Sequence, residues 1–210
     1  MSTISRQTFT TADIADFAQF ISGMGFSDTD FSVEGVYDFI ANSKAKLRLK
    51  IKSSQLVLYV MANGTESIIL NSALISARLV TTANGSALSI YKQAAEITPS
   101  SSQMIILAPA VSTYDKSAAD ILIVGNGLGS SNNFYAPDMQ AFGTVETVPG
   151  PIADSLNTVT FKLAGSKTYY IPDGLYVLRN TNVALSTNYY RLILNNVPYE
   201  TIGYLALKDE

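Results

Sequence analysis

The sequence predicts a mainly β fold: an antiparallel β-sandwich or barrel-like meander with one short N-terminal α-helix. Three observations favour this class. Apolar and polar residues alternate over many short runs, turn residues recur between those runs, and one helical stripe lies near the N-terminus. The chain has 210 residues, of which 47% are hydrophobic and 15% charged, so it can bury a sizeable core and is not expected to be disordered.

The N-terminal helix is expected to begin at Thr10 or Thr11, because either hydroxyl can cap an orphaned backbone amide. Its apolar stripe follows the spacing i, i+3, i+4, i+7 and consists of Ile14, Phe17, Ala18 and Ile21. Gly23 and Gly25 are expected to end the helix. Residues 33–41 fit either a second short helix or a strand, and the sequence leaves both alternatives open.

From Lys44 onward the apolar period is two, which indicates strands. Asn63-Gly64 and Asn84-Gly85 predict type I′ hairpin turns, in which both central residues have positive φ. The expected strands are Lys44–Lys52, Gln55–Ala62, Thr65–Asn71, Ala73–Thr82, Ser86–Lys92, Met104–Ala108, Ile121–Val124, Asn157–Leu163, Thr168–Ile171, Leu175–Arg179, Tyr189–Asn195 and Thr201–Leu207.

Two breaks divide this series of strands. Gly125–Asn133 is expected to be a long flexible loop, and Pro149-Gly150-Pro151 is the most rigid break in the chain. We therefore predict an N-terminal helical segment at 1–43, a β-meander at 44–148, and C-terminal strands at 149–210 that pack in the same domain.

The composition excludes several kinds of chemistry. The chain has no Cys, His or Trp, which removes disulfides, thiol nucleophiles, zinc fingers and Ser-His-Asp catalysis. The Gly-rich run at 125–129 follows a strand but does not open a helix, so it does not fit a nucleotide-binding turn. Asp28-Thr29-Asp30 lacks the later Gly and Glu of a calcium loop, and the scattered carboxylates form no obvious catalytic pair. We predict no enzyme, no cofactor and no metal site.

Positive charge is concentrated in one predicted strand, whose basic residues are Lys44, Lys46, Arg48, Lys50 and Lys52. Removing these five charges from the net charge of −3 leaves −8 on the rest of the chain. The strand can be a solvated face that protects a sheet edge, or an interface for an acidic partner or a neighbouring identical subunit. Nucleic acid is the least favoured partner, since the sequence pI is about 5.0.

The interface candidates are these five basic residues together with Asn126, Leu128, Asn132 and Asn133 of the Gly-rich loop. If the basic strand is an interface, Arg48→Glu with Lys50→Glu is expected to weaken assembly and leave the fold intact. The Tyr169-Tyr170 and Tyr189-Tyr190 pairs suggest an alternative, because each would place one ring on either face of a strand. Outward rings could line a sugar site, so the alternative function is a carbohydrate-recognising receptor-binding or adhesin module.

A family resemblance is carried by three features together: a short capped helix, a Ser/Thr/Asn-rich meander with Asn-Gly hairpins, and the closing segments 169–178 and 188–194. In these features the chain resembles a structural (virion) protein of tailed bacteriophages. The resemblance implies a homo-oligomeric tail, neck, baseplate or capsid-decorating subunit that contacts other virion proteins. Such a protein is synthesised in the host cytoplasm and ends in the virion. No secretory signal or membrane-length apolar run is present, so no membrane partner is expected.

Overall fold

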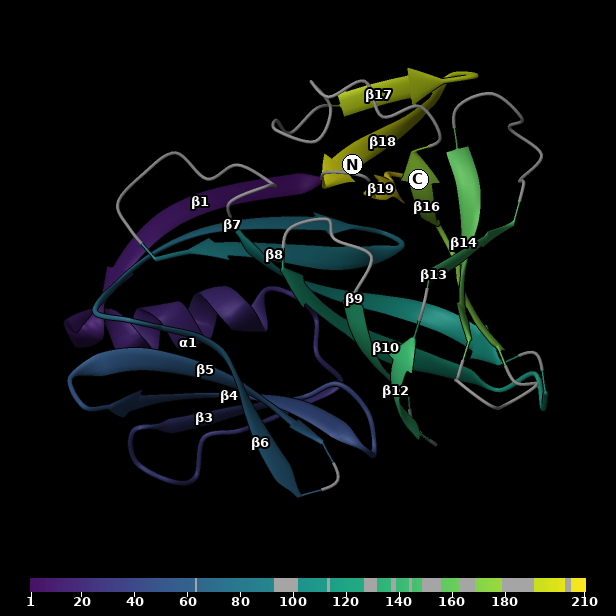
Figure 1. Cartoon of the computed structure of the whole chain (residues 1–210). Helices are drawn as coiled ribbons and strands as arrows, with labels where there is room; N and C mark the ends of the chain where they lie inside the picture. The colour runs from purple at the N-terminus through teal and green to yellow at the C-terminus, as the bar shows by residue number, and fades with distance from the viewer. Residues whose placement is uncertain are drawn as a thin grey trace.

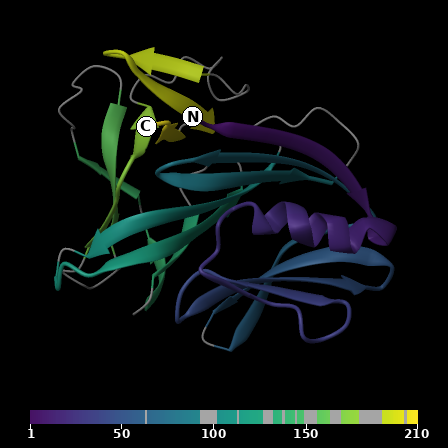
Figure 2. The same ribbon diagram turned by 180° about the vertical axis from the view of Figure 1, so that it is seen from behind.

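The computed structural model describes residues 1–62, 64–92, 102–112, 114–126, 132–136, 139–143, 145–148, 156–162, 169–178, 191–202 and 205–210. These residues form two antiparallel sheets, one of fourteen strands (sheet A) and one of five (sheet B). The sheets pack face to face, and a helix lies between them at one end (Figures 1 and 2). The predicted fold class, a mainly β, sandwich-like architecture with an N-terminal helix, is confirmed.

The helix begins with a 3-10 turn, Thr11–Asp13, and continues as α1, Ile14–Ser22. Thr10 precedes it and donates two hydrogen bonds to Asp13 Oδ2, from its backbone N at 2.8 Å and from Oγ1 at 2.7 Å. These bonds hold the pKa of the exposed Asp13 carboxyl below its usual value. The predicted stripe faces the core: Phe17 is fully buried, and its ring stacks on Phe9 with centroids 4.7 Å apart.

Sheet B has the strand order β2-β3-β4-β5-β6, so each strand pairs with its neighbour in the sequence. Its strands are β2 Asp28–Asp30, β3 Val36–Ile40, β4 Ala45–Lys52, β5 Gln55–Ala62 and β6 Thr65–Ser72. Residues 33–41 therefore contain a strand, and the alternative of a second helix is wrong. Gly35 turns the chain into β3 with a φ of 71°.

Sheet A contains strands from both ends of the chain. They are β1 Thr3–Thr10, β7 Leu74–Thr82, β8 Gly85–Tyr91, β9 Gln103–Ser112, β10 Ala118–Asn126, β11 Asn132–Ala136, β12 Met139–Gly143, β13 Val145–Val148, β14 Leu156–Lys162, β15 Tyr169–Pro172, β16 Leu175–Leu178, β17 Arg191–Leu194, β18 Val197–Ile202 and β19 Leu205–Lys208. Its main path runs β1-β7-β8-β9-β15-β14-β16-β19-β18-β17. The predicted single strand 201–207 is wrong, because Ile202 pairs with Leu205 across a hairpin.

Two hairpins use turns in which both central residues have positive φ. Ser53 and Ser54 (52° and 58°) connect β4 to β5, and Asn195 and Asn196 (52° and 65°) connect β17 to β18. Small or amide side chains tolerate this left-handed backbone best after glycine.

The prediction of a type I′ turn at Asn84-Gly85 is wrong. Thr82 pairs with Gly85, so residues 83 and 84 form the turn, and Asn84 does not have a positive φ. For the other predicted Asn-Gly turn, Gly64 has a φ of 79° between the paired Ala62 and Thr65. Asn63 lies outside the described residues.

The core has two main layers, one on each face of the middle strands of sheet A. Sheet B, α1 and one face of β7–β10 enclose the larger cluster, which includes Phe17, Leu47, Leu58 and Leu88. The other faces of β8–β10 pack against β15, β16, β18 and β19 in a second cluster. Strands β8, β9 and β10 are therefore buried on both faces, and most of their residues are apolar or small, as in the runs Ile105–Ala108 of β9 and Ile121–Val124 of β10.

Candidate assembly surfaces

The five basic residues of the predicted interface (the basic strip: Lys44, Lys46, Arg48, Lys50 and Lys52) lie on or next to β4, as the period-two pattern requires. Leu47 and Leu49 point into the core, so the cations between them lie on the outer face of sheet B. However, β4 is the central strand of sheet B, between β3 and β5. The interpretation that its lysines protect a sheet edge is therefore wrong.

One acidic residue of β3 and one of β6 bind the middle of the basic strip. Asp38 on β3 is the register partner of Arg48, and it accepts bonds from Arg48 Nε at 2.6 Å and Arg48 Nη2 at 2.7 Å. Lys46 Nζ also binds the Asp38 carboxylate. Glu66 on β6 lies 3.3 Å from Arg48 Nη1 and 3.2 Å from Lys50 Nζ.

Lys50 makes one further contact on this face, with its ammonium group 4.5 Å from the ring centroid of Tyr59. Three cations thus share two carboxylates and an aromatic ring within one sheet. The strip is an internal ion-pair network along most of its length, and it offers a partner far less free positive charge than five isolated cations would.

The network perturbs the acid that lies at its centre. The side chain of Asp38 is only 5% exposed, and burial alone would raise its pKa. Hydrogen bonds from Arg48 and Lys46 outweigh that effect and hold the pKa of Asp38 below its usual value. Asp38 is therefore ionised in the folded protein, and its charge is part of what holds β3 against β4.

We expect Asp38 to make folding stability depend on pH in the acid range. Because its pKa is lower in the folded state, its contribution is fully present above its unfolded pKa of about 3.9 and is lost as pH falls below that value. Denaturant unfolding of the wild type and of Asp38→Asn should differ by a constant amount between about pH 5 and 8. That difference should shrink below about pH 4. A difference that stays constant to pH 2.5 would contradict the ion-pair assignment.

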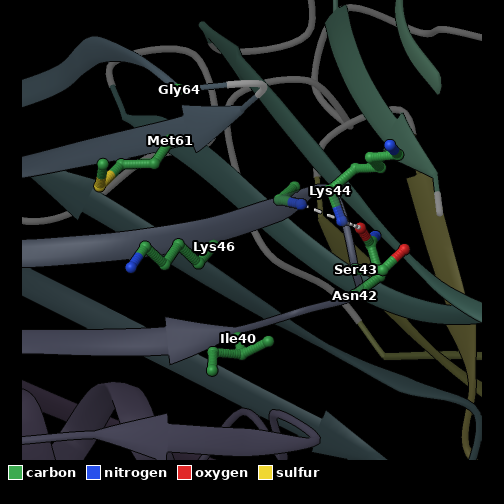
Figure 3. A pocket seen from close by; sticks show the side chains of 8 residues that line it. Ile40, Asn42, Ser43, Lys44, Lys46, Met61 and Gly64 are labelled. Carbon is green, nitrogen blue, oxygen red and sulfur yellow. Dashed lines mark hydrogen bonds between the residues drawn. The ribbon is translucent and has the colours of Figure 1, made fainter. Parts of the chain in front are cut away.

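Only the ends of the basic strip, Lys44 and Lys52, form no ion pair with a described residue. Lys44 borders a hollow of about 330 Å³, which is lined by Ile40, Asn42, Ser43, Lys44, Ala45, Lys46, Met61 and Gly64. Figure 3 shows the ammonium groups of Lys44 and Lys46 pointing away from each other. The two charges do not converge, so this hollow is not a preformed anion site.

The second set of predicted interface residues falls on a hairpin. Asn126 is the last residue of β10, whereas Asn132 and Asn133 belong to β11 and pair with Gly125 and Val124. The prediction of a loop over 125–133 is therefore wrong at both ends. Leu128 lies outside the described residues.

Tyrosine, the basis of the carbohydrate alternative, is only partly described. Tyr170 is 3% exposed and packs in the second core cluster. The side chain of Tyr169 and both residues of the 189–190 pair lie outside the described part. Among the described residues, no group of three or more acidic side chains could hold a metal ion.

Strand β1 is a surface that the sequence pattern did not reveal. It pairs with β7 over eight residues without a break, from Thr3 opposite Thr81 to Thr10 opposite Leu74. No strand in the described part of the chain pairs with its other edge (Figure 1). Seven of its eight residues are exposed, and only Phe9 is buried. The strand has neither an apolar stripe nor an alternating pattern, and so it escapes a search for hydrophobic periodicity.

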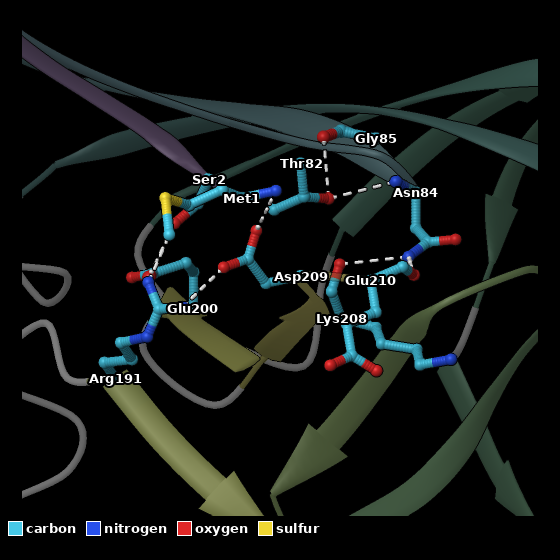
Figure 4. Close-up of polar contacts among 10 residues, drawn as sticks. All are labelled: Met1, Ser2, Thr82, Asn84, Gly85, Arg191, Glu200, Lys208, Asp209 and Glu210. Atoms are coloured by element: carbon cyan, nitrogen blue, oxygen red, sulfur yellow. Dashed lines mark hydrogen bonds and ion pairs between the residues drawn. The ribbon is translucent and has the colours of Figure 1, made fainter. Parts of the chain in front are cut away.

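The C-terminal strands are fastened by a second polar network, which the sequence also did not indicate (Figure 4). Arg191 Nη1 lies 2.9 Å from Glu200 Oε1, and Arg191 Nη2 lies 2.7 Å from Asp209 Oδ2. Both carboxylates are almost fully buried. Asn84, from the β7–β8 turn, donates from Nδ2 to the carbonyl oxygens of Lys208 at 3.1 Å and Glu210 at 2.5 Å. This network serves the fold, because it ties β17–β19 to the middle of sheet A.

Comparison of the chain with protein-family models, curated proteins and solved structures gave no match. Within the described residues, no helix is long and apolar enough to cross a bilayer. The surfaces described above are therefore the basis for assigning a function.

Proposed function

We propose that this chain is a structural subunit of a tailed-phage virion that assembles with copies of itself and with other virion proteins. The observation that carries the proposal is the open edge of β1. An unpaired edge presents backbone N–H and C=O groups in a row, and proteins that stay monomeric usually protect such edges with Lys, Pro, bulges or short strands. β1 has eight residues, no Lys and no Pro, and an unbroken register.

The phage setting of the proposal is supported by the sequence resemblance, and the mode of action by the kind of surface. A strand edge that accepts another strand makes protein–protein contacts without a catalytic group. Contact through a strand edge also agrees with the state of the basic strip, whose middle cations are already paired with carboxylates of sheet B. The virion station, whether tail, neck, baseplate or capsid decoration, follows from which partner the assembled form binds.

The test is the native mass of the purified chain by light scattering on a sizing column, at low salt and at about 1 M salt. We expect a discrete oligomer, at least twice the 22.6 kDa of one chain. We also expect it to persist at high salt, because edge pairing depends on backbone hydrogen bonds and the basic strip is neutralised within the subunit. A monomer at all concentrations would contradict self-assembly. Dissociation by salt alone would indicate that the interface lies at the ends of the basic strip, Lys44 and Lys52, and not at β1.

A further inference from the structure

We propose that the open edge of β1 binds the β1 strand of a second copy, antiparallel and about a two-fold axis through Gln7. The two copies of sheet A then form one continuous sheet. This inference rests on the proposed function, since it names the partner and the register of the surface that carries that function. A two-fold contact uses the same surface on both subunits and closes after two copies.

The two-fold axis restricts the possible registers. Antiparallel strands that continue a sheet are related by an axis perpendicular to it, so each residue keeps its face in both copies. Residues opposite one another in an antiparallel pair also share a face. An even-numbered residue of β1 can therefore lie opposite only an even-numbered residue of the second copy. An odd-numbered residue can lie opposite only an odd-numbered one. Only the registers centred on Arg6 or on Gln7 overlap by as many as seven residues.

Charge excludes the register centred on Arg6. Within the subunit, Arg6 already lies directly opposite the buried Arg78 of β7. Centring the contact on Arg6 would place the two copies of Arg6 side by side and create a row of four arginines across the joined sheet. Like charges directly opposite each other destabilise a strand pair.

The register centred on Gln7 avoids this row. It places Arg6 opposite Thr8 of the second copy, Ser5 opposite Phe9, and Ile4 opposite Thr10. The two Gln7 amides meet at the axis, where each has both a donor and an acceptor to offer the other. Ile4, which is 46% exposed in the single subunit, gains a neighbour on the second strand.

The low charge of β1 favours a second copy over a foreign strand. Arg6 is the only charged residue among its eight, so the edge offers an acidic or basic partner little to select by charge. Its own antiparallel copy matches it in length and lacks any opposed like charges in the Gln7 register. The net charge of −3 also opposes association of two copies only weakly.

Cysteine scanning tests the register directly, because the chain has no native thiol. In the proposed dimer, residues 7 of the two copies are direct partners, with Cα atoms about 4.5–5.5 Å apart, which a disulfide can span. Residues 6 are diagonal neighbours about 7–8 Å apart, which is too far. Under mild oxidation of the full chain, Gln7→Cys should form at least about ten-fold more covalent dimer than Arg6→Cys. Glu34→Cys, at an exposed turn residue that belongs to no strand, is the control for random collision.

Each outcome of the crosslinking experiment either supports or contradicts the β1 contact. Preferential crosslinking of Gln7→Cys supports the proposal, and preferential crosslinking of Arg6→Cys overturns the Gln7 register. If neither variant exceeds Glu34→Cys while the wild type is an oligomer, the β1 contact is wrong and the proposed function depends on another surface. If the wild type is a monomer and none of the variants crosslinks, both proposals are contradicted. Unchanged thermal midpoints would show that each variant is folded.

A charge exchange at the same position gives an independent readout. Gln7→Lys and Gln7→Glu each place like charges at the axis, so each variant alone should be monomeric. An equimolar mixture should regain the mass of a dimer, because Lys and Glu then face each other. Recovery in the mixture cannot arise from misfolding of either variant. A mixture that stays monomeric, or single variants that keep the wild-type mass, would overturn the proposal.

Discussion

Replacing Gly174 with alanine should lower the free energy of unfolding by about 3 kcal/mol. Gly174 has a φ of 72°, a backbone conformation that an L side chain adopts only with strain. A Cβ at this position would also lie 2.4 Å from Cβ and 2.6 Å from Cγ of Asn84. Asn84 binds two carbonyl oxygens near the C-terminal end, so it cannot move away without losing those bonds. Denaturant unfolding of the purified variant measures the loss.

Gly35→Ala is the matched control, since Gly35 has nearly the same φ, 71°, and an added Cβ would meet nothing within 4 Å. It should cost about 1 kcal/mol, the strain alone. Asn84→Gly removes the atoms that clash, and in that background Gly174→Ala should also cost only the strain. Equal losses for Gly174→Ala and Gly35→Ala would show that Asn84 does not confine Gly174.

Replacing Arg48 with glutamate should destabilise the protein by about 3 kcal/mol, because it breaks a largely buried ion pair and puts a third carboxylate between Asp38 and Glu66. Lys52→Glu is the control: it reverses a charge on the same strand at an exposed position with no ion pair to a described residue, and should change stability by no more than about 0.5 kcal/mol. Equilibrium unfolding compares the two. Equal, small effects would mean that the network contributes nothing to the fold.

This expectation revises the use of Arg48→Glu with Lys50→Glu as a test of assembly. Both side chains bind Glu66, so the double variant would add two acidic groups to a network that already holds two. Loss of assembly in that variant would reflect a weakened sheet B as much as a lost contact. Lys44 and Lys52 are the better positions for testing the strip as an interface, because changing them leaves the described ion pairs intact.

Much of the fold could be predicted where one face of a strand or helix is buried and the other is wet. The stripe of α1 and the alternation of β4 are such cases, since burial of Phe17 and Leu47 imposes a visible period. β1 was missed because almost none of it is buried. The division of 201–207 into β18 and β19 was missed because Ile202 and Leu205–Leu207 give this segment an apolar character throughout, and Gly203 is its single turn residue.

The candidate site shows the same limit more strongly. The sequence locates five cations along β4, but Asp38 and Glu66, which bind three of them, are on β3 and β6. Only the strand order brings them together. Likewise, Asn84 and Gly174 are ninety residues apart in the sequence and meet only through the packing of sheet A. Residue spacing along the chain carries no record of such contacts.

The order of strand pairing has a consequence for how the chain folds. Every pairing in sheet B joins neighbouring strands and closes a short loop, so sheet B can form early and locally. β1 pairs with residues roughly 70 positions away and must wait until β7 exists. The open edge is therefore created only after β7 is in place, whereas the strand pairs of sheet B can form before it. A growing chain that has not yet reached Thr82, the end of β7, would lack this edge and could not pair through it.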